Sequence, residues 1–439
     1  MRRESAMETQ PEIHHAGTVL RSAIASRLLL IVLILLWRSL LTPYDTSASI
    51  NPSCLAATAN PAAAADRHRI LFPRIAAAIE DSIVWDSVYF VRIAQCGYEY
   101  EQSYAFLPLL PACISLLSRT GFAPLVPLVG RRAVLGISGY AINNIAFIFA
   151  ALYLHRQVSV WSSIWAFMLS LVVLKDPEAA LRASILFCFN PASVFYTSIY
   201  TESLFALLSI GGVYHLMLGA NNIATVFLAL SGSARSNGVL NAGYICFQTM
   251  HSAYDAIILK KNAHSALQVL IGGAFRCVCI FVPFIAFQVY GYRNMCLGRS
   301  PDEIRPWCRA RLPSLYNYIQ SHYWYLIIHS HPVATLYLIQ INTSSILSGR
   351  GVGFLRYFQL KQLPNFLLAF PILSLALCSI IDYVKVQPDV FFSLGFRASP
   401  LDQNVAAVTD QDTRTKSDYF SHKEASKVRE GIVFKHELA

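Results

Sequence analysis

Long apolar runs alternate with short polar stretches along most of this chain, and this pattern predicts membrane-spanning helices. A helix that crosses a bilayer needs about 20 mostly apolar residues, and the longer runs approach that length. The shorter runs can equally be half-spans or re-entrant segments. After a first run at residues 28–41, extended upstream by residues 23–26, the candidate spans are residues 104–118, 133–155, 158–175, 181–190, 193–218, 223–232, 237–250, 266–290, 325–347 and 364–384. The sequence therefore predicts an all-α, polytopic membrane helix bundle.

Polar segments flank the apolar region and predict its orientation. Residues 1–23 are mostly polar and basic, and four arginines precede the first apolar run: Arg2, Arg3, Arg21 and Arg27. Because positive charge is retained on the cytoplasmic side, we expect residues 1–23 to be cytoplasmic and the following loop lumenal. A cleaved signal peptide is the rival interpretation, but no clean cleavage site follows the run directly. Residues 24–384 form the multispan domain, and residues 385–439 are expected to be a polar, disordered tail.

The expected lumenal loop contains one amphipathic stretch, residues 72–95. Ile75, Ile79, Ile83 and Phe90 recur near helical spacing with acidic residues between them. This periodicity predicts an interfacial helix that lies on the membrane surface.

Composition agrees with a membrane protein and excludes several other classes. Of the 439 residues, 55% are hydrophobic and 14% are charged, whereas an ordinary soluble domain has about 25% charged residues. The net charge of +10 fits basic cytoplasmic loops, and its scattered distribution argues against nucleic-acid binding. The 10 cysteines contain no CxxC pair, so neither a metal site nor a bound cofactor is expected.

Acidic residues at the edges of apolar segments are the candidates for chemistry, because charges in such places are costly. Trp85 and Asp86 lie where the interfacial stretch meets the lumenal side. Glu99 and Glu101 follow among tyrosines, just before an apolar turn bracketed by prolines. Each can also be explained without function, Asp86 as a solvated acid and the glutamates as an ordinary loop entering a helix.

Glu202 interrupts a segment that is otherwise apolar and aromatic, and a buried carboxylate needs a partner. Arg235 is the nearest downstream cation in a similar setting. A structural ion pair between helices and a catalytic role are both open at this point.

Five blocks of this chain, taken together and in order, resemble the GPI mannosyltransferase 2 family of the PIG-V type. They are WDSVYFVRIAQCGYEYEQSYAFLPLLP, FNPASVFYTSIYTESLFALL, ARSNGVLNAG, PWCRARLPSLYNYIQSHYW and GFLRYFQLKQLPNFLLAFP, from residue 85 to residue 371. The resemblance implies a GT-C glycosyltransferase in the endoplasmic-reticulum membrane with a lumenal active site. It also implies transfer of the second mannose, α1,6-linked, from dolichyl-phosphate-mannose to the GPI precursor lipid, with a small membrane-protein subunit as a further partner.

The resemblance also implies roles for the candidate residues. Asp86 matches the family's lumenal acid after tryptophan and is expected to be the catalytic base. Arg235 is expected to stabilise the departing phosphate. The residues expected to bind substrate are Trp85, Glu99, Glu101, Glu202, Arg235 and Asn237.

Two departures from the family pattern leave other functions open. Residues 325–350 separate two blocks that are nearly adjacent in the family, and they are long enough to add a span. The chain also lacks the later apolar segments of the family, so a truncated or inactive form is one alternative. A multispan transporter and a non-catalytic subunit are the remaining alternatives.

Overall fold

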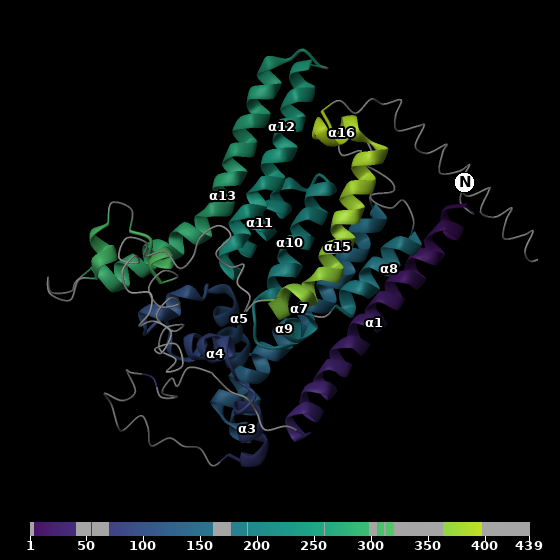
Figure 1. Ribbon diagram of the computed structural model, residues 1–439. Coiled ribbons are helices and arrows are strands. Elements are labelled where there is room, and N and C mark those ends of the chain that lie inside the picture. The colour runs from purple at the N-terminus through teal and green to yellow at the C-terminus, as the bar shows by residue number, and fades with distance from the viewer. Residues whose placement is uncertain are drawn as a thin grey trace, which may run out of the picture. The chain divides into compact units, whose positions relative to one another are not determined.

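The computed structural model describes residues 4–40, 54, 70–160, 177–190, 192–258, 260–297, 305–310, 313–319 and 363–396, and all regular structure within these ranges is helical (Figure 1). The chain divides into two compact units. Residues 1–159 and 176–370 form the first, and residues 160–175 and 371–439 form the second. The candidate site lies wholly in the first unit.

Within the described residues, four helices are long and apolar enough to cross a membrane. The qualifying segments are His15–Trp37 in α1 (Glu4–Leu40), Arg131–Arg156 in α7 (Arg131–Val160), Ala263–Cys296, which is all of α13, and Ala369–Val386 in α15 (Leu363–Val386). A fifth is obtained if α5 (Leu109–Arg119) and the bent segment Ala123–Val129 are one span with a 67° break. The expectation of an all-α polytopic membrane protein is confirmed.

The helix with the longest qualifying segment, α13, shows why the sequence forms a span. Its N-cap Asn262 accepts a hydrogen bond of 3.0 Å from the backbone nitrogen of Ser265, which satisfies one of the unpaired donors of the first turn. Leu267, Ile271, Phe275, Val278 and Val282 remain exposed at helical spacing. Such a stripe is stable against lipid tails and costly in water.

The helices α10 (Glu202–Met217), α11 (Asn221–Ala234), α12 (Ala242–Ile258) and α13 pack side by side (Figure 1). Two close approaches rely on glycine. A Cβ on Gly212 of α10 would lie 2.3 Å from Leu228 Cδ2, and one on Gly273 of α13 would lie 2.2 Å from Thr249 Oγ1. Small residues at such contacts let membrane helices pack closely.

The amphipathic stretch at residues 72–95 is not one helix. It divides into α3 (Pro73–Glu80) and α4 (Asp86–Cys96), because Trp85 has a φ of 54° that an α-helix cannot continue through. The candidate span at residues 193–218 is also broken, into α9 (Ser193–Thr197) and α10. Spacing of apolar residues does not reveal such breaks, since the periodicity resumes after them.

The first span begins earlier than the hydropathy pattern indicates. Its apolar segment opens at His15, so Arg27 lies within the span instead of preceding it. Arg27 is only 3% exposed. The expected extra span at residues 325–347, the whole insertion at 325–350 and most of the tail lie outside the described residues.

Two disulfides join Cys54 to Cys96 and Cys296 to Cys308. The first ties Cys54, between α1 and α3, to Cys96, the last residue of α4. The second ties the end of α13 to η6 (Pro306–Arg309). Nothing in the cysteine spacing anticipated either pair, because both depend on where α4 and α13 end.

A buried apolar cluster fixes the position of α4. Val91, Leu110, Ile114, Leu135 and Ile199 are members of this cluster, and each is at most 1% exposed. They come from α4, α5, α7 and the turn between α9 and α10. The cluster therefore holds the N-terminus of α4 beside that turn.

Candidate active site

Asp86 is the first residue of α4, where the unpaired backbone N–H groups of a helix favour a carboxylate. Trp85 precedes it with a backbone conformation that is strained for a bulky residue, of a kind that clusters at functional sites. Burial raises the pKa of the Asp86 carboxyl, the nearby Glu202 raises it further, and Arg235 opposes both effects. Asp86, Glu202 and Arg235 are thus electrostatic neighbours.

Glu202 opens α10, and Arg235 is the residue at which α11 ends in an extended conformation. The Arg235 guanidinium donates a hydrogen bond from Nη1 to Glu202 Oε1, so the expected ion pair is present. The second oxygen, Oε2, is buried and accepts no hydrogen bond from the described residues. One carboxylate oxygen of the pair therefore has unused hydrogen-bonding capacity, close to the carboxyl of Asp86.

Two tyrosines, Tyr89 and Tyr200, lie close enough to Asp86 to be affected by its charge. Burial, the main cause, and the charge of Asp86 together raise the pKa of Tyr200 to about 12, although a hydrogen bond with the Asp86 backbone lowers it. Burial and then Asp86 also raise the pKa of Tyr89. Tyr200 is a site residue that sequence reasoning did not single out; its position two residues before Glu202 was the available signal.

The turn between α9 and α10 is held by side chains that donate hydrogen bonds to three consecutive backbone carbonyls. Asn144 Nδ2 donates to the Thr197 carbonyl at 3.3 Å, and Asn143 Nδ2 donates to the carbonyl of Ser198. Ser87 Oγ, next to Asp86, donates to the Ile199 carbonyl at 3.1 Å. Side chains of α7 and α4 thus fix the turn that presents Tyr200 and Glu202.

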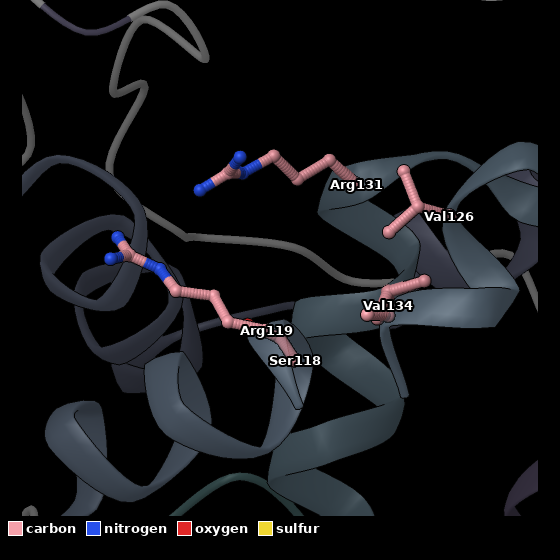
Figure 2. Close-up of a pocket in the computed structure, with 6 residues that line it drawn as sticks. Ser118, Arg119, Val126, Arg131 and Val134 are labelled. Atoms are coloured by element: carbon pink, nitrogen blue, oxygen red, sulfur yellow. The ribbon is translucent and has the colours of Figure 1, made fainter. Parts of the chain in front are cut away.

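A cavity of about 190 Å³ lies elsewhere, between the end of α5 and the start of α7 (Figure 2). Arg119 and Arg131 line it together with small and apolar side chains. None of the candidate site residues contributes to it. The cavity therefore does not coincide with the charged group around Asp86.

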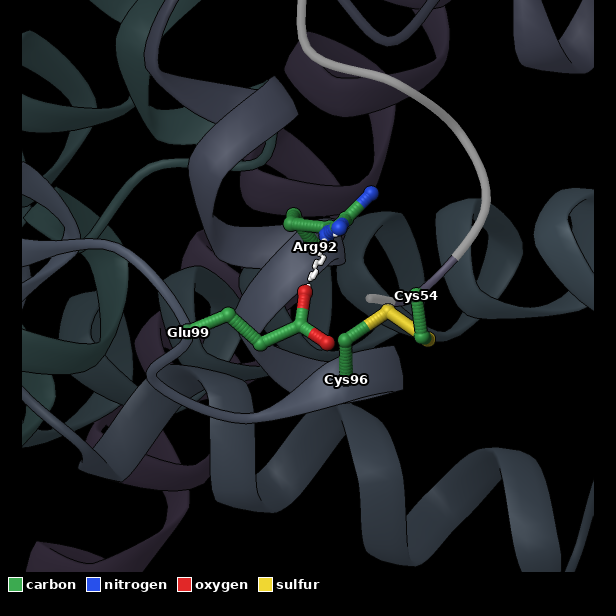
Figure 3. The surroundings of a disulfide bond; sticks show 4 residues. All are labelled: Cys54, Arg92, Cys96 and Glu99. Carbon is green, nitrogen blue, oxygen red and sulfur yellow. Dashed lines mark hydrogen bonds and ion pairs between the residues drawn. A yellow bond between two sulfur atoms is a disulfide. The ribbon is translucent and has the colours of Figure 1, made fainter. Parts of the chain in front are cut away.

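Glu99 and Glu101 have partners of their own. Glu99 Oε2 accepts a hydrogen bond of 2.6 Å from Arg92, beside the Cys54–Cys96 disulfide (Figure 3). The sulfurs and a Glu99 oxygen lie within 4.8 Å of one another, but disulfide sulfurs provide no thiolate for a metal ion. Glu99 therefore pairs with Arg92 and is not part of the charged group around Asp86. A substrate-binding role for Glu99 stays a prediction.

Glu101 Oε1 accepts a hydrogen bond of 2.7 Å from Trp307 Nε1, and Oε2 lies 3.5 Å from Arg305 Nε. Glu101 is buried, so this interaction docks η6 onto η2 (Glu101–Ala105), the short 3-10 helix before α5. Asn237 is exposed in η4 (Ser236–Asn241), two residues after Arg235. The substrate-binding roles of Glu101 and Asn237 also stay predictions.

The fold and this site define a polytopic membrane protein with a carboxylate of raised pKa beside an arginine–glutamate pair. Residues 16–328 and 347–426 match the family model described as Mannosyltransferase (PIG-V), and the chain belongs to this family. The unmatched residues 329–346 fall within the segment 325–350. The chain matches no solved structure.

Curated relatives bear related names. The chain is 29% identical over 335 residues to GPI alpha-1,6-mannosyltransferase 2 of Cricetulus griseus and to that of Homo sapiens, covering 72% of this chain and 60% of each relative. It is 28% identical over 331 residues to GPI mannosyltransferase 2 of Drosophila melanogaster, covering 69% of this chain and 63% of that protein. The matched region thus spans about 60% of the relatives' length.

Proposed function

We propose that this protein transfers the second mannose, in α1,6 linkage, from dolichyl-phosphate-mannose to a GPI precursor lipid in the endoplasmic-reticulum membrane. The observation that carries the proposal is the convergence of Asp86, Glu202 and Arg235 from three separate helices. The family match and the names of the relatives supply the substrate class.

Asp86 is the catalytic base in this proposal. It takes the proton of the acceptor hydroxyl as the acceptor oxygen attacks C1 of mannose, and the bond between C1 and the phosphate oxygen breaks. A base works best when its pKa approaches the working pH, so the raised pKa of Asp86 favours this role over that of a solvated acid. Dolichyl phosphate leaves with the bonding electron pair.

Arg235 stabilises the charge of the departing phosphate, since a guanidinium binds phosphate oxygens by charge-assisted hydrogen bonds. Glu202 holds Arg235 in place through the ion pair. Trp85, which is 44% exposed beside Asp86, offers an aromatic face to a sugar ring. Both disulfides suit an oxidising compartment, which supports a lumenal location for the ends of α4 and α13.

The test is mannosyl transfer in microsomes from cells that lack the second GPI mannose and express the full chain. With radiolabelled dolichyl-phosphate-mannose and a GPI precursor that carries one mannose, we expect a labelled two-mannose lipid. Asp86→Asn should lower the rate by about 10²–10⁴-fold at equal protein abundance. The matched control is Asp81→Asn, an exposed acid five positions before Asp86.

An absence of labelled product with the unaltered chain would contradict the proposal and leave the transporter and non-catalytic interpretations. Normal activity of Asp86→Asn would remove Asp86 from the base role while leaving the transfer reaction itself established.

A further inference from the structure

Arg27 is a charged residue buried inside the first membrane span. It is 3% exposed, and a continuous apolar run, residues 28–36, follows it directly in its helix. A charge at such a depth is costly, so its retention calls for a specific partner.

Its partners lie at the last residue of α8 (Pro177–Cys188) and in α9. The guanidinium donates to the Cys188 carbonyl at 3.2 Å, to the Ser193 carbonyl at 3.3 Å and Ser193 Oγ at 3.1 Å, and to Thr197 Oγ1 at 2.9 Å. It also stacks 3.6 Å above the ring centroid of Phe147 in α7. A fifth hydrogen bond of 3.3 Å goes to Ser26 Oγ in its own helix. All five end on neutral oxygens, so Arg27 binds backbone carbonyls and hydroxyls, chiefly those of α9, instead of neutralising an acid.

These contacts lead directly to the candidate site. Thr197, which Arg27 contacts, is the last residue of α9. The next residues form the turn that Asn143 and Ser87 hold, and Tyr200 and Glu202 follow. Arg27 therefore fixes the start of the segment whose end faces Asp86.

We propose that Arg27 is a positioning residue for the proposed mannosyl transfer: through its hydrogen bonds to Ser193 and Thr197, it keeps residues 193–202 in the conformation that places Tyr200 and Glu202 against Asp86. This inference rests on the proposed function for its kinetic consequence. Its structural consequence, the immobilisation of residues 193–202, is independent of that function.

The test compares full-length Arg27→Lys with the unaltered chain. Lysine keeps the positive charge but loses the planar fork of donors that reaches several oxygens at once. The control is Arg21→Lys, an exposed arginine on the same helix. Thr197→Val removes a single hydrogen-bond acceptor at nearly constant volume and tests the contact from the other side.

We expect Arg27→Lys to lower kcat by about 10- to 100-fold, because a displaced site group costs this much, with little change in KM. The acid limb of the pH–rate profile should also move to lower pH. Burial and Glu202 raise the pKa of Asp86, whereas Arg235 lowers it. Tyr89 and Tyr200 are the other titratable groups that face Asp86. A loosened turn weakens both the burial of Asp86 and the effect of Glu202, so the pKa of Asp86 should fall. The Arg27→Lys, Thr197→Val double variant should be no slower than Arg27→Lys, since both changes remove the same contact.

Hydrogen exchange of the purified chain in detergent provides the readout without catalysis. Amides of residues 193–202 should exchange about tenfold faster or more in Arg27→Lys, and at the normal rate in Arg21→Lys. Unchanged exchange in Arg27→Lys would overturn the inference, as would faster exchange with normal kcat and an unshifted pH profile. Faster exchange in a chain whose unaltered form transfers no mannose would instead contradict the proposed function, and the positioning of residues 193–202 would stand.

Discussion

Asp86 ionises in surroundings that two other helices control. An aspartate carboxyl ordinarily has a pKa of 3.8. Burial and the charge of Glu202 raise the pKa of Asp86 above this value, and Arg235 partly offsets the increase. A catalytic base acts in its ionised form, so activity must fall as the pH drops through this raised pKa. Replacing Glu202 by glutamine removes the negative charge that raises the pKa of Asp86. The acid limb of kcat/KM should therefore move to lower pH in Glu202→Gln, measured with the microsomal transfer assay; a limb that stays in place would separate Glu202 from Asp86.

Gly238 is a second residue whose local surroundings determine the site. A Cβ on Gly238 would lie 2.3 Å from the backbone carbonyl oxygen of Ser231, which cannot move without disturbing the end of α11 and thus Arg235. Gly238→Ala should destabilise the protein by about 1–3 kcal/mol and lower transfer activity. Gly243→Ala is the matched control, because nothing lies within 4 Å of its added Cβ. Thermal unfolding in detergent compares the two, and equal melting temperatures would refute the steric argument.

At the scale of elements, the contact of η6 with η2 joins residues that are 206 positions apart in the chain. Trp307 donates to the buried carboxylate of Glu101, and the Cys296–Cys308 disulfide holds η6 to α13. Trp307→Phe keeps the aromatic packing but removes the N–H donor. The expected loss is about 1–3 kcal/mol of stability, since a buried acceptor loses its partner.

The control for that substitution is Trp37→Phe, because Trp37 is exposed on α1 and its loss should leave the melting temperature unchanged. If Trp307→Phe is equally harmless, the hydrogen bond to Glu101 does not stabilise the docking of η6.

At the scale of the whole molecule, the unmatched residues 329–346 lie between two segments that the family model matches. Residues 325–350 are long and apolar enough for a span, and one extra crossing would place all later loops on the opposite side of the membrane. Deleting residues 325–350 should therefore give activity equal to or above that of the full chain. Surface levels of GPI-anchored protein in deficient cells measure this, and rescue by the full chain alone would show that the segment is needed.

The local sequence determined the class of structure. Hydropathy and helical periodicity depend on neighbours within a few turns, so the spans in α1, α7, α13 and α15 follow from composition in short windows. The same local signal predicted the charged residues Asp86, Glu202 and Arg235, because charges stand out in apolar surroundings. It did not indicate the break at Trp85, which depends on a single backbone angle.

Only the tertiary structure decided which distant groups meet. Arg27 and Thr197 are 170 residues apart, and nothing in either local pattern indicates their hydrogen bond. The partners of Glu99 and Glu101 and the pairing of the cysteines depend in the same way on where helices end and how they pack. Apolar patterning indicates that a residue is buried. The hydrogen-bond partners and the charges near a buried group depend on which elements pack around it. For this reason the sequence predicted a membrane enzyme with candidate acidic residues, and the folded chain showed which groups lie around those residues.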